Sequence, residues 1–277
     1  MTRRIAFVNE KGGSGKTTLV ANVAAWLALR RGRRVLGIDL DPQGQLGKCL
    51  GLDVRRSQRS ALELVVTSVL DPASLDETPV TPRAGEDPLP WVSTRIPGLD
   101  LVVANKALAL YAGFDGDDDD PTARLRRHLA RSPRARRYDF LLMDAPPSFG
   151  PLTLNVLRAA DEVVIPVPLT YLGLDGCAEL VRTLQTVRTR FGHPGLRVAM
   201  VIPTFYRRTR LAHEVLDALK AQVPKELCHT GLGHHVRIDE AQSRGLSIFE
   251  YAPGDRGARA LAAVAEELEA RAPEAAA

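Results

Sequence analysis

The sequence Glu10-Lys11-Gly12-Gly13-Ser14-Gly15-Lys16-Thr17-Thr18 decides the fold of this 277-residue chain. It follows a β-rich apolar run at residues 5–8 and precedes residues 19–29, where apolar side chains recur at helical spacing. The glycines therefore lie where a strand turns into the N-terminus of a helix. Backbone N–H groups converge at such a turn, and glycine lets them approach phosphate oxygens closely. The stretch predicts a P-loop that binds a nucleotide.

The residues of this loop have separate expected roles. Lys16 is expected to reach the β- and γ-phosphates, and the hydroxyl of Thr17 is expected to bind Mg²⁺. The loop departs from the general G-x-x-x-x-G-K-[ST] pattern because Glu10 replaces the first glycine and a second lysine, Lys11, follows it. A Gly-rich turn with solvated lysines is the alternative, but the strand-to-helix context favours phosphate binding. The expected nucleotide-binding residues are Gly12, Gly13, Ser14, Gly15, Lys16, Thr17 and Thr18.

Composition is that of a soluble globular protein, with 45% hydrophobic and 25% charged residues. No apolar run approaches the ~18 residues of a membrane span, and residues 1–4 lead into a strand rather than a signal peptide, so we expect a cytoplasmic protein. The widely spaced Cys49, Cys177 and Cys228 predict neither a disulfide framework nor a zinc site. The net charge of +4 is compatible with nucleic-acid binding without establishing it.

Two further apolar runs end in aspartates that are followed by proline. Residues 33–44 indicate a buried strand ending in Asp39 and Asp41, and residues 138–148 indicate a strand ending in Asp144. Ligands of open α/β sheets lie at the carboxyl ends of the strands, so these carboxylates are placed to meet phosphates and Mg²⁺. A simple acidic turn remains the alternative for the first pair, because Asp and Pro are common in turns.

Strands and helices alternate along the chain. Further strands are predicted at 99–104, 163–167 and 198–202, and a helix at 174–191. This alternation predicts an α/β fold: a mostly parallel, twisted sheet with helices on both faces, as in a single-domain P-loop NTPase spanning residues 1–277.

Several segments are expected at the surface. Residues 71–98 are rich in proline and predict a long surface excursion, and residues 271–277 predict a disordered tail. Residues 113–121 predict a solvated acidic loop rather than a metal site, because the ligand spacing of an EF-hand is missing. The basic, partly helical residues 124–137 are interpreted as a solvated helix face.

Three motifs resemble those of ParA-type partition ATPases, which carry a deviant Walker A loop and belong with MinD in one superfamily. They lie at residues 11–18, at 39–44 (Asp-Leu-Asp-Pro-Gln-Gly) and at 144–148 (Asp-Ala-Pro-Pro-Ser). The similarity continues in residues 236–243 and 249–258, so it covers nearly the whole chain. Since the first strand starts near the N-terminus, we expect the small form without a helix-turn-helix extension, which does not read operator sequences.

The resemblance implies an ATPase that uses ATP and Mg²⁺ and forms a homodimer on ATP. It implies that the dimer binds double-stranded DNA nonspecifically and that a ParB-like centromere-binding protein stimulates hydrolysis. A cytoplasmic, nucleoid-associated protein that segregates a plasmid or chromosome, without binding a membrane, is the expectation that follows.

Individual residues take roles from the same resemblance. Lys11 resembles the signature lysine that crosses the dimer interface to the partner's phosphates, a charge-stabilising role. Asp41 looks like the residue that positions or activates the attacking water, and Lys16 completes the expected catalytic set. Asp144 would hold the Mg²⁺ shell together with Thr17, while Asp39 is a further candidate metal group whose role is left open.

A basic cluster at residues 205–210 is the candidate DNA site, together with an arginine in the segment 236–243. Both places resemble positions where the family carries DNA-contacting arginines, with Arg208 and Arg237 matching most closely. The alternative is a solvated loop with ion pairs to Glu214 or Asp217. The candidate DNA-binding residues are Arg207, Arg208, Arg210 and Arg237.

Three other functions compete with DNA partition. A MinD-like or other cargo-positioning ATPase shares the loop, but the acidic tail at 262–270 does not resemble a basic membrane helix. A reductase resembling the nitrogenase iron protein needs paired cysteines for its iron–sulfur cluster, which the three cysteines fit poorly. A nucleotide-switched DNA-binding scaffold with negligible turnover is the non-enzyme alternative.

Overall fold

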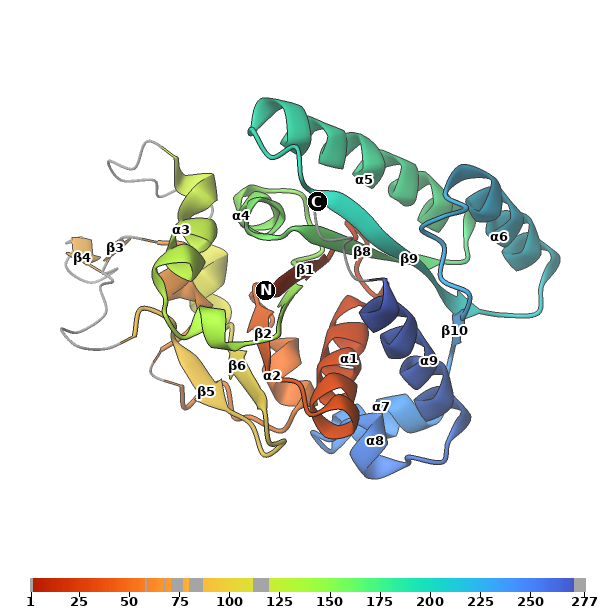
Figure 1. Ribbon diagram of the computed structural model, residues 1–277, viewed down its shortest axis with the longest axis horizontal. Coiled ribbons are helices and arrows are strands. Elements are labelled where there is room, and N and C mark those ends of the chain that lie inside the picture. Colours follow the sequence, from red (N-terminus) through yellow and green to blue (C-terminus); the bar gives the residue numbers. More distant parts are fainter. Residues whose placement is uncertain are drawn as a thin grey trace.

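An eight-stranded sheet organises the molecule (Figure 1), with the strand order β10-β9-β8-β1-β7-β2-β6-β5. The computed structural model describes residues 2–57, 59–66, 68–70, 77–79, 87–111 and 120–271. The strands are β1 (Arg3–Phe7), β2 (Val35–Asp39), β5 (Trp91–Ser93), β6 (Leu99–Val102), β7 (Phe140–Asp144), β8 (Glu162–Pro168), β9 (Arg197–Tyr206) and β10 (Leu232–Gly233). All neighbours are parallel except β5 and β6, so the predicted mostly parallel sheet is confirmed.

Helices cover both faces of this sheet, as predicted. Figure 1 shows α4, α5 and α6 on one side and α1, α7, α8 and α9 on the other. The helices are α1 (Lys16–Arg31), α2 (Gln45–Cys49), α3 (Arg124–Arg131), α4 (Pro151–Ala159), α5 (Tyr171–Arg190), α6 (Arg210–Gln222), α7 (Val236–Ser243), α8 (Ile248–Tyr251) and α9 (Arg256–Ala270). A small antiparallel pair, β3 (Ser68–Leu70) with β4 (Glu77–Pro79), lies apart from the main sheet.

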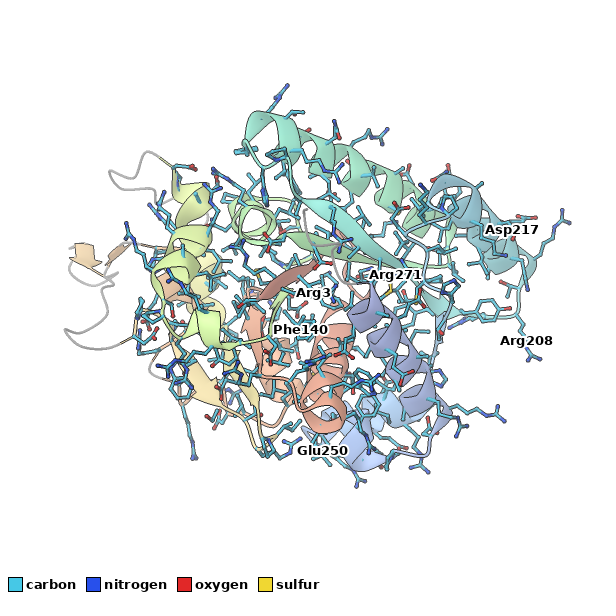
Figure 2. The ribbon with its side chains drawn as sticks, viewed as in Figure 1. Arg3, Phe140, Arg208, Asp217, Glu250 and Arg271 are labelled. Atoms are coloured by element: carbon cyan, nitrogen blue, oxygen red, sulfur yellow. The ribbon has the colours of Figure 1, made fainter. Side chains whose placement is uncertain are left out.

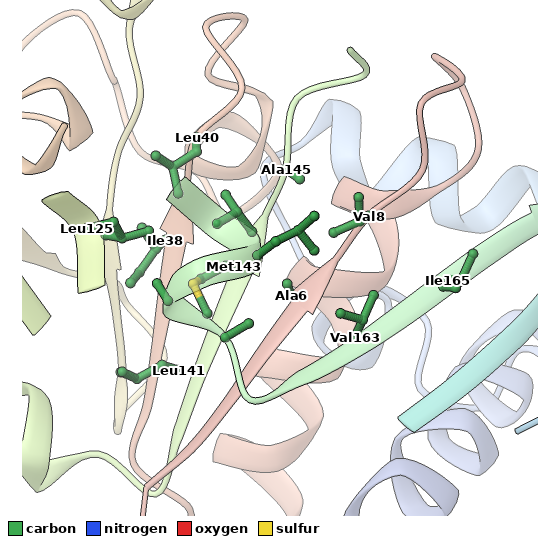
Figure 3. Close-up of a cluster of buried hydrophobic side chains, with 14 of the residues drawn as sticks. Ala6, Val8, Ile38, Leu40, Leu125, Leu141, Met143, Ala145, Val163 and Ile165 are labelled. Carbon is green, nitrogen blue, oxygen red and sulfur yellow. The ribbon is translucent and has the colours of Figure 1, made fainter. Parts of the chain in front are cut away.

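Each face of the sheet has its own apolar core, because successive side chains of a strand point to opposite faces. On one face Ala6, Ile38 and Met143 pack with Leu125 of α3, as Figure 3 shows. The opposite face is filled mainly by residues of β1, β7, α1 and α9. Burial on both faces explains why the strands read as continuous apolar runs in the sequence.

The expected surface segments are only partly as predicted. Within residues 71–98, β5 pairs with β6 at the sheet edge, and the guanidinium carbon of Arg134 lies 3.3 Å from the centroid of the Trp91 ring. Of the acidic loop, residues 113–119 lie outside the described residues. Asp120 is not simply solvated, because it pairs with the buried Arg158, and this hydrogen bond lowers the pKa of its carboxyl group.

Two basic residues depart from the expected surface positions. The solvated-face interpretation of 124–137 is wrong for Arg124, which is buried and donates a hydrogen bond to the carbonyl of Val65 at 2.9 Å. Arg271 begins the predicted tail, yet its guanidinium donates to the carbonyls of Glu226 and Leu227 at 2.8 and 2.7 Å. Residues 272–277 lie outside the described residues. In both cases backbone carbonyls from distant parts of the chain accept hydrogen bonds from the guanidinium, and Arg124 is buried while Arg271 is partly buried.

Candidate functional site

The Gly-rich loop joins β1 to α1 at the carboxyl edge of the sheet. Gly13 and Gly15 have φ values of 70° and 93°, in the left-handed region that other residues enter at a cost. A methyl group added to Gly12 or Gly13 would have no atom of the described residues within 4 Å, apart from the glycine itself and its chain neighbours, so this part of the loop faces open space. The loop is therefore shaped to receive a group such as a phosphate at the N-terminus of α1.

Lys16 lies inside this loop and closes it. Its side chain is 6% exposed, and its Nζ donates to the carbonyls of Asn9 at 2.9 Å and Lys11 at 3.3 Å. Burial lowers the pKa of Lys16, and the carboxylates of Asp144 and Asp41 oppose that shift. Among the described residues the hydrogen-bond acceptors of this buried cation are carbonyls, so its charge is available to the phosphates of a nucleotide.

Asn9 was missed by the sequence argument although it supports the loop. Its side chain is 2% exposed; the amide donates to the carbonyl of Pro166 at 2.6 Å, and its oxygen accepts from the backbone N–H of Lys11 at 2.8 Å. These bonds tie the start of the loop to β8. A polar residue immediately after an apolar strand was the available signal, but its partner lies 157 residues away.

Asp144 is the buried carboxylate of the site. Thr17 donates its hydroxyl to Oδ2 at 2.6 Å, whereas Oδ1 has no hydrogen-bond partner within the described part of the chain. Burial raises the pKa of Asp144 to about 7, against the opposing effects of Thr17 and Lys16. A buried oxygen without a hydrogen-bond partner is rare and costs free energy, so it marks a position for a ligand. Oxygen atoms are the ligands that Mg²⁺ takes, and Thr17 and Asp144 fit such an ion.

Asp39 and Asp41 follow β2, and β2 runs beside β7 so that Asp39 is paired in register with Asp144. Both oxygens of Asp39 accept backbone hydrogen bonds at 3.0 Å, from the N–H groups of Asp41 and Leu46. Burial, then the charge of Asp144, raises the pKa of Asp39 well above its usual range. Asp39 is thus used to shape the turn that presents Asp41.

Asp41 is half-buried and accepts a hydrogen bond from the backbone N–H of Gln43 at 3.0 Å. A cavity of about 380 Å³ adjoins it, with walls that include Pro146, Pro147 and Leu152. Asp41 is itself one of the residues that line this cavity. Its placement suits a group that acts on a ligand or water at the loop.

The rim of the site carries exposed apolar side chains and a lysine whose charge is not paired with any described residue. Lys11 lies against α5, where a methyl group added to Gly176 would be 3.7 Å from its Cε; its Nζ has no hydrogen bond or ion pair to any described residue. Phe149, Tyr171 and Leu172 are 46%, 71% and 62% exposed. They follow β7 and β8, the two strands that flank β1, so they lie around the loop.

The candidate DNA-binding arginines lie in the segments that follow β9 and β10, at one edge of the sheet. The register pairs Tyr206 with Gly233, so the loop after β9 and the start of α7 are neighbours. Figure 2 shows Arg208 extending outward beside α6. The four arginines are exposed. They are Arg207, Arg208, Arg210 and Arg237.

Two of these four arginines form ion pairs with described residues and two do not. Arg210 pairs with Glu214 at 2.8 Å, and Arg237 pairs with Glu240 at 2.7 Å, whereas no described residue forms an ion pair with Arg207 or Arg208. The expected pairing with Glu214 therefore holds for one arginine. The pairing with Asp217 is not found among the described residues, since Asp217 pairs with Lys220.

Comparison with known proteins extends the similarity over the whole chain. The profile of a family described as an AAA domain matches residues 2–197. The chain is 42% identical over 274 residues to the chromosome-partitioning ATPase Soj of Thermus thermophilus, covering 99% of this chain and 98% of that protein. It is 32% identical to the chromosome partitioning protein ParA of Myxococcus xanthus, covering 96% and 87% of the two chains.

A solved structure with a similar fold holds a nucleotide. It is cobyrinic acid a,c-diamide synthase from Mycobacterium smegmatis with bound ADP and magnesium, with a TM-score of 0.74 at 30% identity, covering 96% of this chain and 93% of that one. Each of these three similarities covers at least 96% of this chain.

Proposed function

Since the chain belongs to the ParA-type family of partition ATPases, we propose that it hydrolyses ATP with Mg²⁺ and partitions a plasmid or chromosome. The observation that carries this proposal is the meeting of Lys16, Thr17 and the unpartnered oxygen of Asp144 at an open Gly-rich loop. A buried cation, a hydroxyl and a buried carboxylate are the groups that a magnesium nucleotide needs.

The residues of the loop divide the work of hydrolysis. Backbone N–H groups of residues 12–18 and the N-terminus of α1 hold the phosphates, and Lys16 balances their charge. Thr17 and Asp144 would hold Mg²⁺, which would supply positive charge to the phosphate oxygens. Asp41 orients the attacking water from the turn that Asp39 shapes. No nucleophilic side chain is required, because phosphoryl transfer is catalysed mainly by positioning and electrostatics.

Dimerisation on ATP completes the site in this proposal. Lys11 is free of ion pairs among the described residues and reaches the phosphates of a second copy. The apolar side chains Phe149, Tyr171 and Leu172 surround the loop, and a second copy that covers them removes apolar surface from water. A face that carries exposed apolar side chains and a lysine without an ion pair among the described residues suits an interface whose formation depends on the nucleotide.

DNA binding is assigned to the arginines at the β9–β10 edge. Phosphate contacts by arginine are independent of sequence and release counterions, so this surface binds duplexes nonspecifically. Arg207 and Arg208 have no competing ion pair among the described residues, which leaves their full charge for the DNA backbone. A ParB-like protein bound at a centromere would then stimulate hydrolysis and release the dimer from DNA, in a nucleoid-associated cycle.

The membrane alternative receives no support from α9. Its apolar residues Leu261, Val264 and Leu268 are buried in the core that includes α1, so this face is unavailable to a bilayer. Over the described residues, no helix is long and apolar enough to cross a membrane.

The iron–sulfur alternative is also unsupported. Cys49 lies in α2, Cys177 lies in α5 and Cys228 lies between α6 and β10. Burial raises the pKa of the Cys177 thiol to about 11 and that of Cys228 to about 12. Clusters bind thiolates, and separated thiols that resist ionisation do not provide them.

Phosphate release tests the enzymatic part of the proposal and excludes the scaffold alternative. The wild-type protein should release phosphate from ATP only with Mg²⁺, slowly alone and faster with duplex DNA and a ParB-like protein. Lys11→Ala should lower the stimulated rate by about 10³-fold or more, as expected for loss of a charge supplied in trans. Absence of Mg²⁺-dependent turnover under all of these conditions would leave a nucleotide-switched scaffold.

A further inference from the structure

Both segments that carry the candidate DNA-binding arginines are hydrogen-bonded to the nucleotide loop region. The hydroxyl of Thr204, near the end of β9, donates to the carbonyl of Ser14 at 3.0 Å. The side-chain amide of Gln242, in α7, donates to the hydroxyl of Thr18 at 2.8 Å. These bonds span 190 and 224 residues of sequence, so they join elements that share no local connection.

The first bond stands directly before the basic loop. Thr204 is fully buried, and Arg207 follows three residues later. Between them, Phe205 has a φ of 54°, a left-handed conformation that a bulky residue rarely adopts. Its ring lies beside the nucleotide loop, since a methyl group added to Gly15 would be 3.9 Å from two of the ring carbons. A shift of the loop therefore reaches the arginines through a short, conformationally restrained segment.

The second bond holds the helix that carries Arg237. Gln242 lies five residues after Arg237 in α7, an eight-residue helix that moves as one body because its backbone is internally hydrogen-bonded. The arginine is 57% exposed at the side chain and is held by Glu240. The position of this side chain thus depends on the first turn of α1, where Thr18 lies.

We propose that the Thr204–Ser14 and Gln242–Thr18 hydrogen bonds couple nucleotide occupancy to DNA affinity by fixing both arginine-bearing segments relative to the nucleotide loop. This inference rests on the proposed DNA-binding function and assigns positioning roles to Thr204 and Gln242. Coupling between two binding sites is reciprocal, so DNA raises the affinity for nucleotide by the factor with which nucleotide raises the affinity for DNA.

The test uses Thr204→Val and Gln242→Leu, alone and combined, which remove the hydrogen-bonding groups while keeping the side-chain size. Thr204→Ser retains the hydroxyl and serves as the conservative variant. Thr189→Val and Gln185→Leu make the same changes on the exposed side of α5. Fluorescence anisotropy with one labelled duplex gives the DNA affinity with a slowly hydrolysed ATP analogue and with ADP. Sedimentation velocity gives the dimer fraction in the same samples.

The ratio of interest is the DNA affinity with the ATP analogue divided by the DNA affinity with ADP. In the double variant this ratio should fall by about fivefold or more, within the usual range of coupling factors. The dimer fraction and the analogue affinity without DNA should stay at wild-type values, as should the ratio in Thr204→Ser and the α5 variants. An unchanged ratio in the double variant, or a loss that follows a loss of dimer, would overturn the inference. Equal DNA affinity of the wild-type protein with both nucleotides would instead refute the proposed nucleotide switch, and the coupling with it.

Discussion

Lys16 is the buried cation of the nucleotide loop, and its Nζ donates to the backbone carbonyls of Asn9 and Lys11. Its replacement in Lys16→Ala removes the charge that faces the β- and γ-phosphates. ATP-dependent dimerisation should weaken by about 100-fold or more, comparable to the loss of one charge-stabilising donor. Analytical ultracentrifugation across an ATP-analogue titration measures this, with Lys225→Ala as the exposed control. Normal dimerisation of the Lys16 variant would show that the loop does not hold phosphate as described.

Asp144 makes the nucleotide-free protein sensitive to pH. Its pKa is about 7 in the fold against 3.8 for an ordinary aspartate, so the folded state binds its proton more tightly. This contribution to stability is fully present below about pH 4 and is lost as pH rises through about 7. The free energy of unfolding by urea without Mg²⁺ should therefore fall between pH 5 and about 8.

The Asp144→Asn variant isolates this effect from that of Asp39, whose pKa is raised by the same burial. Its unfolding free energy should vary less with pH over the same window. Magnesium nucleotide needs the ionised carboxylate, so wild-type affinity should improve by up to about tenfold per pH unit below 7. A variant with the full wild-type pH dependence would assign the titration to another group.

Asp41 separates nucleotide binding from hydrolysis. In Asp41→Ala the phosphate loop is intact, so the dimer should form on ATP while stimulated turnover slows by about 100-fold or more. Asp41→Asn keeps an acceptor for the N–H of Gln43, and therefore the turn, but loses the charge; it should be slow as well. Phosphate release measures both. Wild-type rates in the two variants would reduce Asp41 to a turn residue.

At the scale of elements, the loop after β9 and the helix α7 form one basic surface. The double variant Arg208→Ala with Arg237→Ala should bind any duplex more weakly. The slope of log affinity against log salt should become shallower by ~0.9 for each DNA phosphate that is no longer neutralised. Dimerisation on ATP should persist. Anisotropy with two unrelated duplexes across a salt series tests this, and Arg182→Ala on α5 is the control. An unchanged slope would return both arginines to a solvated role.

The elements nearest the nucleotide were also the most predictable from sequence. Strand β1, the Gly-rich loop and α1 follow from one local pattern, and the strands ending at Asp39 and Asp144 were placed by their apolar runs. The predicted strand at 198–202 proved longer, as β9, because pairing with β8 extends to Thr204. The two-residue β10 carries no periodic signal at all.

The hydrogen bonds of Arg124, Gln242 and Asp39 could not be predicted from the sequence, because they depend on how the chain folds rather than on local pattern. Arg124 donates to a carbonyl 59 residues away, and Gln242 donates to a hydroxyl 224 residues away. Local periodicity and propensity contain no information about such pairs. The same holds for Asp39, whose position at a strand end was predicted while its use by two backbone N–H groups was not.

At the scale of the whole molecule, the buried Glu162 at the start of β8 joins both ends of the chain to the sheet. It is 1% exposed and pairs with Arg3 at 2.9 Å and Arg197 at 2.6 Å, while Arg3 also donates to the carbonyls of Leu268 and Glu269 at the end of α9. Buried ion pairs are costly to break because the remaining charges lose their partner.

Glu162→Ala should therefore destabilise the protein by about 3–5 kcal/mol. Glu214→Ala, which breaks an exposed pair with Arg210 on α6, should cost no more than about 1 kcal/mol. Urea unfolding monitored by circular dichroism compares the two. Equal and small effects would mean that the ends of the chain are held by apolar packing alone.

In the proposed function, the nucleotide switches one molecule between a monomer and a DNA-binding dimer. Sedimentation velocity with a fluorescent duplex measures both properties in a single sample, with Mg²⁺ and either ADP or a slowly hydrolysed ATP analogue. This switch requires that the duplex sediment with a protein dimer in the analogue sample and remain free in the ADP sample and with Lys16→Ala. Equal DNA binding in ADP and analogue, or binding by a monomer in both, would contradict it.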